Sequence, residues 1–197
     1  EFERPLNIYR CVYSYVNQSR RDLPDIVGGV VWFGPDRPAT TVLMPFYAGA
    51  KALPESIQRA AILKLDRGSM GTAFNYVANY SMLKYSFMAK DIRQVQARFE
   101  GSAFDKQHEL ETRALVLLEK GDKEGARSLL AGYSEKNAAA VLDAWWKLSE
   151  FLYVKYNDGY INTDREIAQP VFYPAWWLKQ VGFEDGPTSY QQKTKQP

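Results

Sequence analysis

Short extended apolar runs near the N-terminus give way to long stretches of helical spacing after residue 69. Residues 30–33 (VVWF) and 40–44 (TTVLM) are rich in β-branched and aromatic side chains and flank the turn sequence GPDRP. This pattern predicts a β-hairpin. A hairpin that is apolar on both faces is marginal in water, so it needs further strands and a cover on each face. The run AAILKL at residues 60–65 is the candidate third strand.

Apolar residues at three- and four-residue steps predict helices elsewhere. Ile8, Val12 and either Tyr15 or Val16 follow this spacing, so we expect a helix in residues 5–21 that the following Leu-Pro sequence ends.

A proline-free stretch of helical spacing begins at Met70. It predicts a helix over residues 70–99, ended by Gly101-Ser102, and a second helix that ends at Lys120. Gly121 stands where a left-handed residue closes a helix, and Asp122 is expected to cap a short one.

Ser134 is expected to cap the last long helix, which the sequence NDG at residues 157–159 ends. The chain thus divides into residues 1–69, with the first helix and the strands, a helical region over residues 70–160, and an irregular tail over residues 161–197. The predicted fold class is α+β.

Composition excludes several classes of protein. The net charge of +2 at pH 7 comes from lysines and arginines scattered among acids, so no nucleic-acid partner is expected. No apolar stretch is long enough to span a bilayer, so no membrane partner is expected either. Cys11 and His108 are the only residues of their kinds, which rules out an internal disulfide and a multi-Cys or multi-His metal site. We expect no metal and no cofactor.

A Cys11–His108 dyad is the obvious nucleophile and base to test. The sequence argues against it, because Cys11 lies in an apolar run and His108 lies in the charged run KQHELE. The charged residues that follow His108 have the spacing of a solvated helix face with surface ion pairs. These residues are Glu109, Glu111, Arg113, Glu119 and Lys120.

Arg10 and two tryptophan pairs remain as candidate binding residues. Arg10 is a lone charge among apolar neighbours, and its guanidinium could snorkel to water or hold a carboxylate in a fork of two hydrogen bonds. In the pairs Trp145-Trp146 and Trp176-Trp177, the two members must point in different directions. Core packing explains only the inward member of each pair.

The order of short motifs along the chain resembles the C-terminal part of the C69 dipeptidases, which are relatives of the N-terminal-nucleophile amidases that include the choloylglycine hydrolases. The motifs are RCVYSYVNQSR at 10–20, DLP at 22–24, GGVVWFG at 28–34, MPFYAG at 44–49, LDRGS at 65–69, FNYVAN at 74–79, DIRQVQ at 91–96, WWKL at 145–148, KYNDGY at 155–160 and YPAWWLKQVG at 173–182.

The resemblance implies a dipeptidase whose nucleophile is a cysteine at a processed N-terminus. Its free α-amine, with a pKa of about 8, serves as the general base. It also implies a four-layer αββα sandwich, of which this chain would supply the hairpin and a third strand. Arg10 matches an arginine that lies beside the nucleophile in the amidase relatives, whereas Asn17 and Arg20 of the same motif are expected to be structural.

Since the chain starts at Glu1, which has no thiol or hydroxyl, the resemblance implies that the nucleophile lies outside it. We then expect the chain alone to be inactive. Its expected partners are a dipeptide substrate, the N-terminal portion of the same protein and further copies in a homo-oligomer. Cutting the sheet is expected to expose an apolar edge at Val30, Trp32, Val42 and Leu43. The alternatives are a non-catalytic helical interaction module and an amidase acting on another amide, such as an acyl amino acid.

Overall fold

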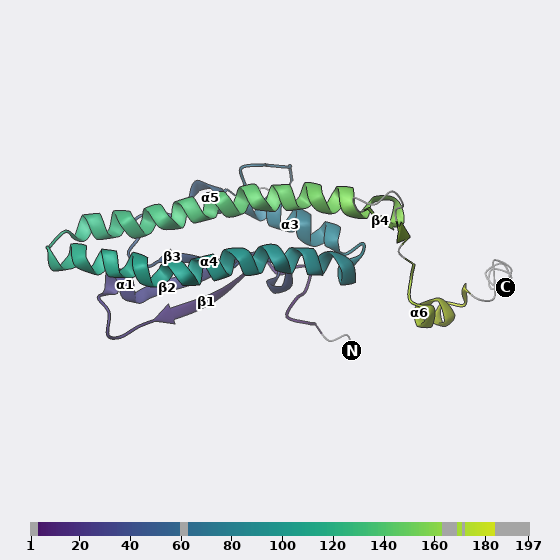
Figure 1. The fold of residues 1–197 in the computed structure, drawn as a ribbon, viewed down its shortest axis with the longest axis horizontal. Helices are drawn as coiled ribbons and strands as arrows, with labels where there is room; N and C mark the ends of the chain where they lie inside the picture. Colours follow the sequence, from purple (N-terminus) through teal and green to yellow (C-terminus); the bar gives the residue numbers. More distant parts are fainter. Residues whose placement is uncertain (1–3, 60–62, 163–168, 171, 184–197) are drawn as a thin grey trace. The chain divides into compact units, whose positions relative to one another are not determined.

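The computed structural model describes residues 4–59, 63–162, 169–170 and 172–183. A three-stranded antiparallel sheet near the N-terminus is followed by a helical region (Figure 1). The predicted α+β class is therefore confirmed. Residues 1–152 form one compact unit and residues 153–197 form a second.

The sheet has the strand order β1-β2-β3. β2 (Gly29–Pro35) is the central strand and pairs antiparallel with both β1 (Tyr13–Ser19) and β3 (Met44–Tyr47). The β2–β3 pair is the predicted hairpin, and a short 3₁₀ turn, η1 (Pro38–Thr40), lies in its connection.

The third strand is β1, so two of the sequence predictions were wrong. Residues 5–21 contain no helix, and residues 63–65 are bent or irregular, while residues 60–62 lie outside the described residues. The segment YSYVNQS pairs with β2 over seven residues. Its tyrosines and valine favour an extended backbone, and β2 supplies hydrogen-bond partners that the local apolar spacing could not reveal.

Five helices belong largely to the first unit. They are α1 (Asp25–Gly28), α2 (Glu55–Gln58), α3 (Met70–Ser81), α4 (Tyr85–Glu119) and α5 (Lys123–Tyr156). Within this unit α4 and α5 run side by side in opposite directions (Figure 1). Between them Gly121 has φ 82°, as predicted for a closing glycine. The Asp122 carboxylate accepts a hydrogen bond from the Gly125 N–H, so Asp122 caps α5.

The predicted helix breaks at Gly101 and Ser134 do not occur. α3 ends at Ser81, and α4 continues through Gly101, where the space around the backbone is open. A glycine inside a helix costs only about 1 kcal/mol relative to alanine, and the long packed helix offsets this. The Ser134 hydroxyl donates to the Pro45 carbonyl at 2.9 Å. It therefore attaches α5 to β3 instead of starting a helix.

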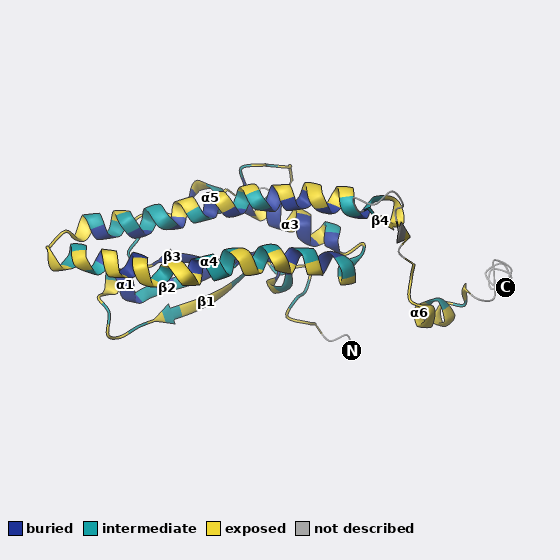
Figure 2. Ribbon diagram, in the orientation of Figure 1, coloured by how far each residue is buried: buried dark blue, intermediate teal, exposed yellow. Residues whose placement is uncertain are grey.

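α4 and α5 together cover one face of the sheet. Alternate residues of β2, with Tyr47 of β3, join both helices in one core, and Trp32 stacks on Phe104 of α4 at 4.5 Å between ring centroids. The members of this core are Val27, Val30, Trp32, Tyr47, Ala103, Leu110, Ala114, Ala126 and Leu130. The expected exposed edge was wrong for Val30, Trp32 and Val42, which are all buried. Figure 2 shows β1 as the exposed strand instead.

A second set of buried residues joins α3 to the other half of the long helices. Phe74 and Trp145 stack at 4.3 Å with their planes 10° apart. The neighbouring Trp146 donates from Nε1 to the Arg67 carbonyl at 2.9 Å, and the Arg67 guanidinium lies over its ring. Trp145 is thus the core member of this pair, and Trp146 fixes the loop before α3.

A largely buried ion pair, in which Arg20 keeps 23% of its side chain exposed, connects the end of β1 to α4. Arg20 donates to both carboxylate oxygens of Glu111, at 2.6 and 2.8 Å. The Tyr47 hydroxyl and the Gln107 amide donate to the same carboxylate, each at 2.9 Å. The prediction that Glu111 lies on a solvated face was wrong, since its exposed fraction is 8%. Its position three residues before Ala114 and one after Leu110 places it on the inward stripe.

The electrostatics of this cluster favour the charged carboxylate. Burial alone raises the pKa of Glu111, but hydrogen bonds from Arg20, Gln107 and Tyr47 outweigh it, and the pKa falls below its usual value. Burial, followed by the adjacent Glu111 charge, raises the pKa of Tyr47. Tyr47 therefore remains a neutral donor at physiological pH.

The second unit contains only short elements after the end of α5, as far as its residues are described. They are the 3₁₀ turn η2 (Asn157–Gly159), the antiparallel pair β4 (Tyr160–Ile161) and β5 (Gln169–Pro170), and α6 (Ala175–Gln180). Tyr173 stacks on Trp177 at 4.7 Å, whereas Trp176 is 65% exposed. The predicted end of the long helix at residues 157–159 is confirmed.

We predict that Glu111→Gln lowers the free energy of unfolding by about 1–3 kcal/mol, because Arg20 loses its counter-charge in a site mostly closed to water. Urea denaturation followed by circular dichroism measures the change. The matched control on the same helix is Glu109→Gln, whose carboxylate is 75% exposed beside Arg113. This control changes stability by less than about 0.5 kcal/mol. Equal losses in the two variants would contradict the role of the buried pair.

The lowered pKa of Glu111 also predicts acid sensitivity. A carboxyl group with a lower pKa in the folded than in the unfolded protein stabilises the fold above its unfolded pKa, and this contribution is lost as pH falls through the folded pKa. We therefore expect stability to fall with acidification below the ordinary Glu value of 4.5, more steeply in the parent protein than in Glu111→Gln. Urea midpoints at pH 7, 5, 4 and 3 test this, and parallel curves for the two proteins would refute it.

Candidate functional site

A cleft of about 610 Å³ lies in the first unit, beside the segment that leads into β1. Its walls come from this segment, from the end of β2, from the loop before α3, and from the first two turns of α3. The lining residues are Tyr9, Arg10, Cys11, Val12, Asp36, Lys64, Leu65, Thr72, Asn75 and Tyr76. Arg10 was the one site residue predicted from the sequence, and it lines this cleft.

Asp36 joins three of the cleft walls. Its backbone has φ 64°, a conformation that Asp tolerates better than most residues, and its N–H donates to the Val12 carbonyl at 2.7 Å. One carboxylate oxygen accepts from the backbone and side chain of Arg37, at 2.8 and 3.1 Å. The other accepts from the Asn75 amide at 2.8 Å. The turn and α3 are therefore held in a fixed relation.

The Asp36 charge is already neutralised within the fold. Arg37 is 1% exposed and donates to Asn79 on α3 at 3.1 Å as well as to Asp36. A buried guanidinium with these two acceptors compensates the buried carboxylate beside it. Asp36 thus fixes the floor of the cleft and leaves no net negative charge in it.

Arg10 and Lys64 give the cleft a surplus of positive charge. Both side chains are exposed, and the Arg10 guanidinium lies 5.5 Å from the centre of the Tyr9 ring. Within the described residues neither cation forms an ion pair with a carboxylate. The cleft can therefore accept an anionic group.

The structure does not assemble Cys11 and His108 into a dyad. The Cys11 thiol donates to the Tyr13 carbonyl at 3.3 Å, and its backbone N–H donates to the Ile8 carbonyl. His108 is exposed on α4 and does not line the cleft. Since the Cys11 nitrogen is an amide, it cannot act as a base as a free α-amine does.

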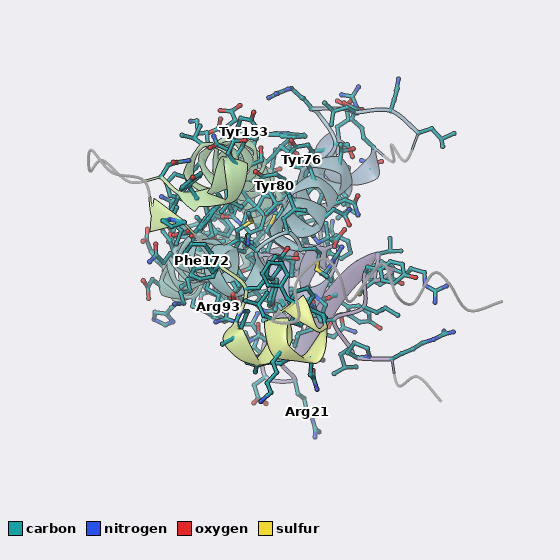
Figure 3. The ribbon with its side chains drawn as sticks, turned by 90° about the vertical axis from the view of Figure 1, so that its right-hand side faces the viewer. Arg21, Tyr76, Tyr80, Arg93, Tyr153 and Phe172 are labelled. Atoms are coloured by element: carbon teal, nitrogen blue, oxygen red, sulfur yellow. The ribbon has the colours of Figure 1, made fainter. Side chains whose placement is uncertain are left out.

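Sequence reasoning missed Lys64 and Asn75 as cleft residues. Lys64 lay in a run that was predicted to be a strand, and Asn75 lay in a long stretch of helical spacing. Nothing in the sequence near Asn75 indicated that it contacts Asp36. The DRG turn after Lys64 was the available signal, because turn residues next to a strand-like run indicate a loop. Figure 3 shows the α3 surface near this cleft, where Tyr76 and Tyr80 lie side by side with ring centroids 6.5 Å apart.

A second hollow, of about 590 Å³, lies on the sheet face opposite α4 and α5. Val31, Phe33 and Phe46 line it, together with the loop after β3. Next to it, Tyr13 stacks on Phe33 at 5.8 Å, and Tyr13 and Tyr15 are both more than half exposed. On this aromatic sheet face the two β1 tyrosines are exposed, whereas Phe46 is buried.

The described residues hold neither a metal-binding cluster nor a membrane-spanning helix. They contain no group of three or more His, Cys, Asp and Glu side chains placed to hold a metal ion. They also contain no helix that is both long and apolar enough to cross a membrane.

Comparison with known proteins gives one family. Residues 1–98 match the family model of peptidase family C69, whereas no curated protein matches the chain. The matched region contains all three strands of the sheet, α3 and every residue that lines the cleft. The chain therefore carries a region of peptidase family C69 over residues 1–98.

Proposed function

We propose that this C69-family chain belongs to a cysteine-type dipeptidase whose nucleophile lies in polypeptide outside these 197 residues. The observation that carries the proposal is the family match over residues 1–98. It includes the whole positively charged cleft, with Arg10 in its wall. The thiol of a free N-terminal cysteine would attack the peptide carbonyl, and its α-amine would take the thiol proton and pass it to the leaving amine as the C–N bond breaks. Water would then hydrolyse the resulting thioester and release the free thiol.

Arg10 has a supporting role in this proposal. Its guanidinium carries a permanent charge and five N–H donors, so it can orient an anionic group without taking part in proton transfer. It lies one residue before Cys11, whose thiol is occupied by a hydrogen bond to a backbone carbonyl. Cys11 is accordingly a wall residue of the cleft and not the nucleophile.

We further propose that the aromatic sheet face packs against the polypeptide that supplies the nucleophile. Tyr13 is 54% and Tyr15 56% exposed, and they continue a row of aromatic contacts that includes Phe33 and Phe46. Antiparallel sheets can leave one face to water, but that face is then usually polar. An aromatic face of this kind fits a covered layer better than a solvated one. That several copies of the chain form a homo-oligomer remains a separate prediction.

The first test measures hydrolysis by the longer protein. We expect it to cleave dipeptides without a metal ion, so that EDTA has no effect. The Cys11→Ser variant is expected to keep this activity. Loss of a nucleophile costs a rate factor on the order of 10⁶, so even a small residual activity in a folded Cys11→Ser variant identifies another nucleophile. Alkylation of an N-terminal cysteine should abolish hydrolysis. A folded Cys11→Ser enzyme with no activity would contradict the proposal, and inactivity of the parent protein on dipeptides would favour the interaction module.

The second test compares one substitution in two lengths of chain. Tyr15→Ser is expected to destabilise the longer protein by about 1–3 kcal/mol, because a covered aromatic ring is lost. In the 197-residue chain the same ring is half exposed, so we expect a loss of less than about 1 kcal/mol. Val116→Ser, at an exposed apolar position on α4, is the surface control. Equal losses from Tyr15→Ser in both lengths would contradict a covering partner.

A further inference from the structure

We propose that Arg10 and Lys64 bind the C-terminal carboxylate of the dipeptide in the cleft beside β1. This inference rests on the proposed dipeptidase function and names the part of the substrate that this chain recognises. On this inference, residues between Tyr9 and Tyr76 select substrates that have a free carboxyl terminus. The cleavage of the peptide bond is carried out by other groups.

The charges in the cleft support an anionic ligand group. Asp36 is the acid among the lining residues, and both of its oxygens already accept hydrogen bonds from within the fold. Arg10 and Lys64 enter from different segments of the chain, one before β1 and one in the loop before α3. Two cations and one compensated acid leave a positive field that a carboxylate can neutralise.

Lys64 differs from the other cations of its loop. Arg59 lies 3.3 Å from an Asp66 oxygen, and Arg67 lies 3.6 Å from a Glu150 oxygen. These neighbours are therefore used to hold the loop. Lys64 has no such partner within the described residues, although Asp66 is only two positions away. Its ammonium remains available to a ligand.

Asn75 adds a fixed neutral donor. Its side-chain nitrogen gives one N–H to Asp36, and its oxygen accepts from Asn79 at 2.9 Å. An amide nitrogen has two N–H groups, so the second can donate to a carboxylate oxygen. Because both ends of the amide are already held, this donor needs little reordering when a ligand binds.

The rest of the cleft suits a small peptide. Its volume of about 610 Å³ falls within the ordinary range of small-molecule sites. Tyr9, Val12 and Leu65 give apolar surface for a side chain next to the carboxylate. A site that holds a free C-terminal carboxylate favours very short peptides, because a longer chain has to place its extra C-terminal residues in the same small cleft.

The experiment compares Ala-Ala with its C-terminal amide, using the full-length protein. For the parent enzyme we expect a KM about tenfold lower for Ala-Ala than for the amide, which is the size of effect for a lost charged hydrogen bond. Lys64→Gln should raise the KM for Ala-Ala about tenfold and leave kcat and the amide kinetics nearly unchanged. Arg10→Gln should also remove the preference for the free carboxylate. Arg21→Gln is the matched control, since Arg21 is exposed, points away from the fold (Figure 3) and does not line the cleft.

The outcomes separate this inference from the proposed function. Hydrolysis of Ala-Ala with no preference over the amide, or a preference that Lys64→Gln leaves intact, would overturn the inference while the dipeptidase function stands. If the protein hydrolyses neither compound, calorimetric titration with both decides the inference alone. Tighter binding of Ala-Ala than of its amide, lost in Lys64→Gln but kept in Arg21→Gln, would support the carboxylate site without the dipeptidase. Equal binding of the two would overturn it.

Discussion

The ion pair between Arg20 and Glu111 fixes the sheet against its helices. Arg20 lies directly after β1, and Glu111 lies in the C-terminal third of α4, 91 positions later in the sequence. The carboxylate also accepts from Tyr47 of β3, so one side chain of α4 holds both outer strands. A buried ion pair adds little net stability over an apolar pair, but it strongly disfavours arrangements in which either charge is left alone. Here the ion pair favours one position of the sheet relative to α4 over alternative positions.

That position of the sheet determines where the cleft forms. β1 begins at Tyr13, directly after the cleft residues 9–12, and pairs in order with β2 up to Pro35. Asp36 follows at once, and its bonds to Val12 and Asn75 bring the end of β2 against α3. A shift of one residue between β1 and β2 would turn every side chain of β1 to the other face. The distant Arg20–Glu111 pair therefore helps to place Arg10.

The sequence could predict the elements that depend on local interactions. The β2–β3 hairpin has strong turn residues, and Gly121 and Asp122 mark helix ends through their own backbone and side-chain preferences. β1 could not be predicted in this way, because its extended form depends on pairing with β2. Glu111 was misread for a similar reason. A charged residue on a helix is usually solvated, and its partner Arg20 is far away in the sequence. The cleft was predictable only at Arg10, since Lys64 and Asn75 reach it through tertiary structure.

Charge compensation explains why a nearly neutral chain can still present a cationic site. The net charge is only +2, yet the local balance is uneven. Arg20, Arg37 and Arg59 each contact a carboxylate that also orders a turn or a strand. The carboxylates of Glu111, Asp36 and Asp66 are therefore already paired within the fold. None of them pairs with Arg10 or Lys64 in the cleft. An unpaired exposed cation costs little while water solvates it. In a cleft with a buried, compensated floor, the same cations gain most when a ligand carboxylate displaces that water. The folding of this region thus determines the charge of the ligand that it can bind.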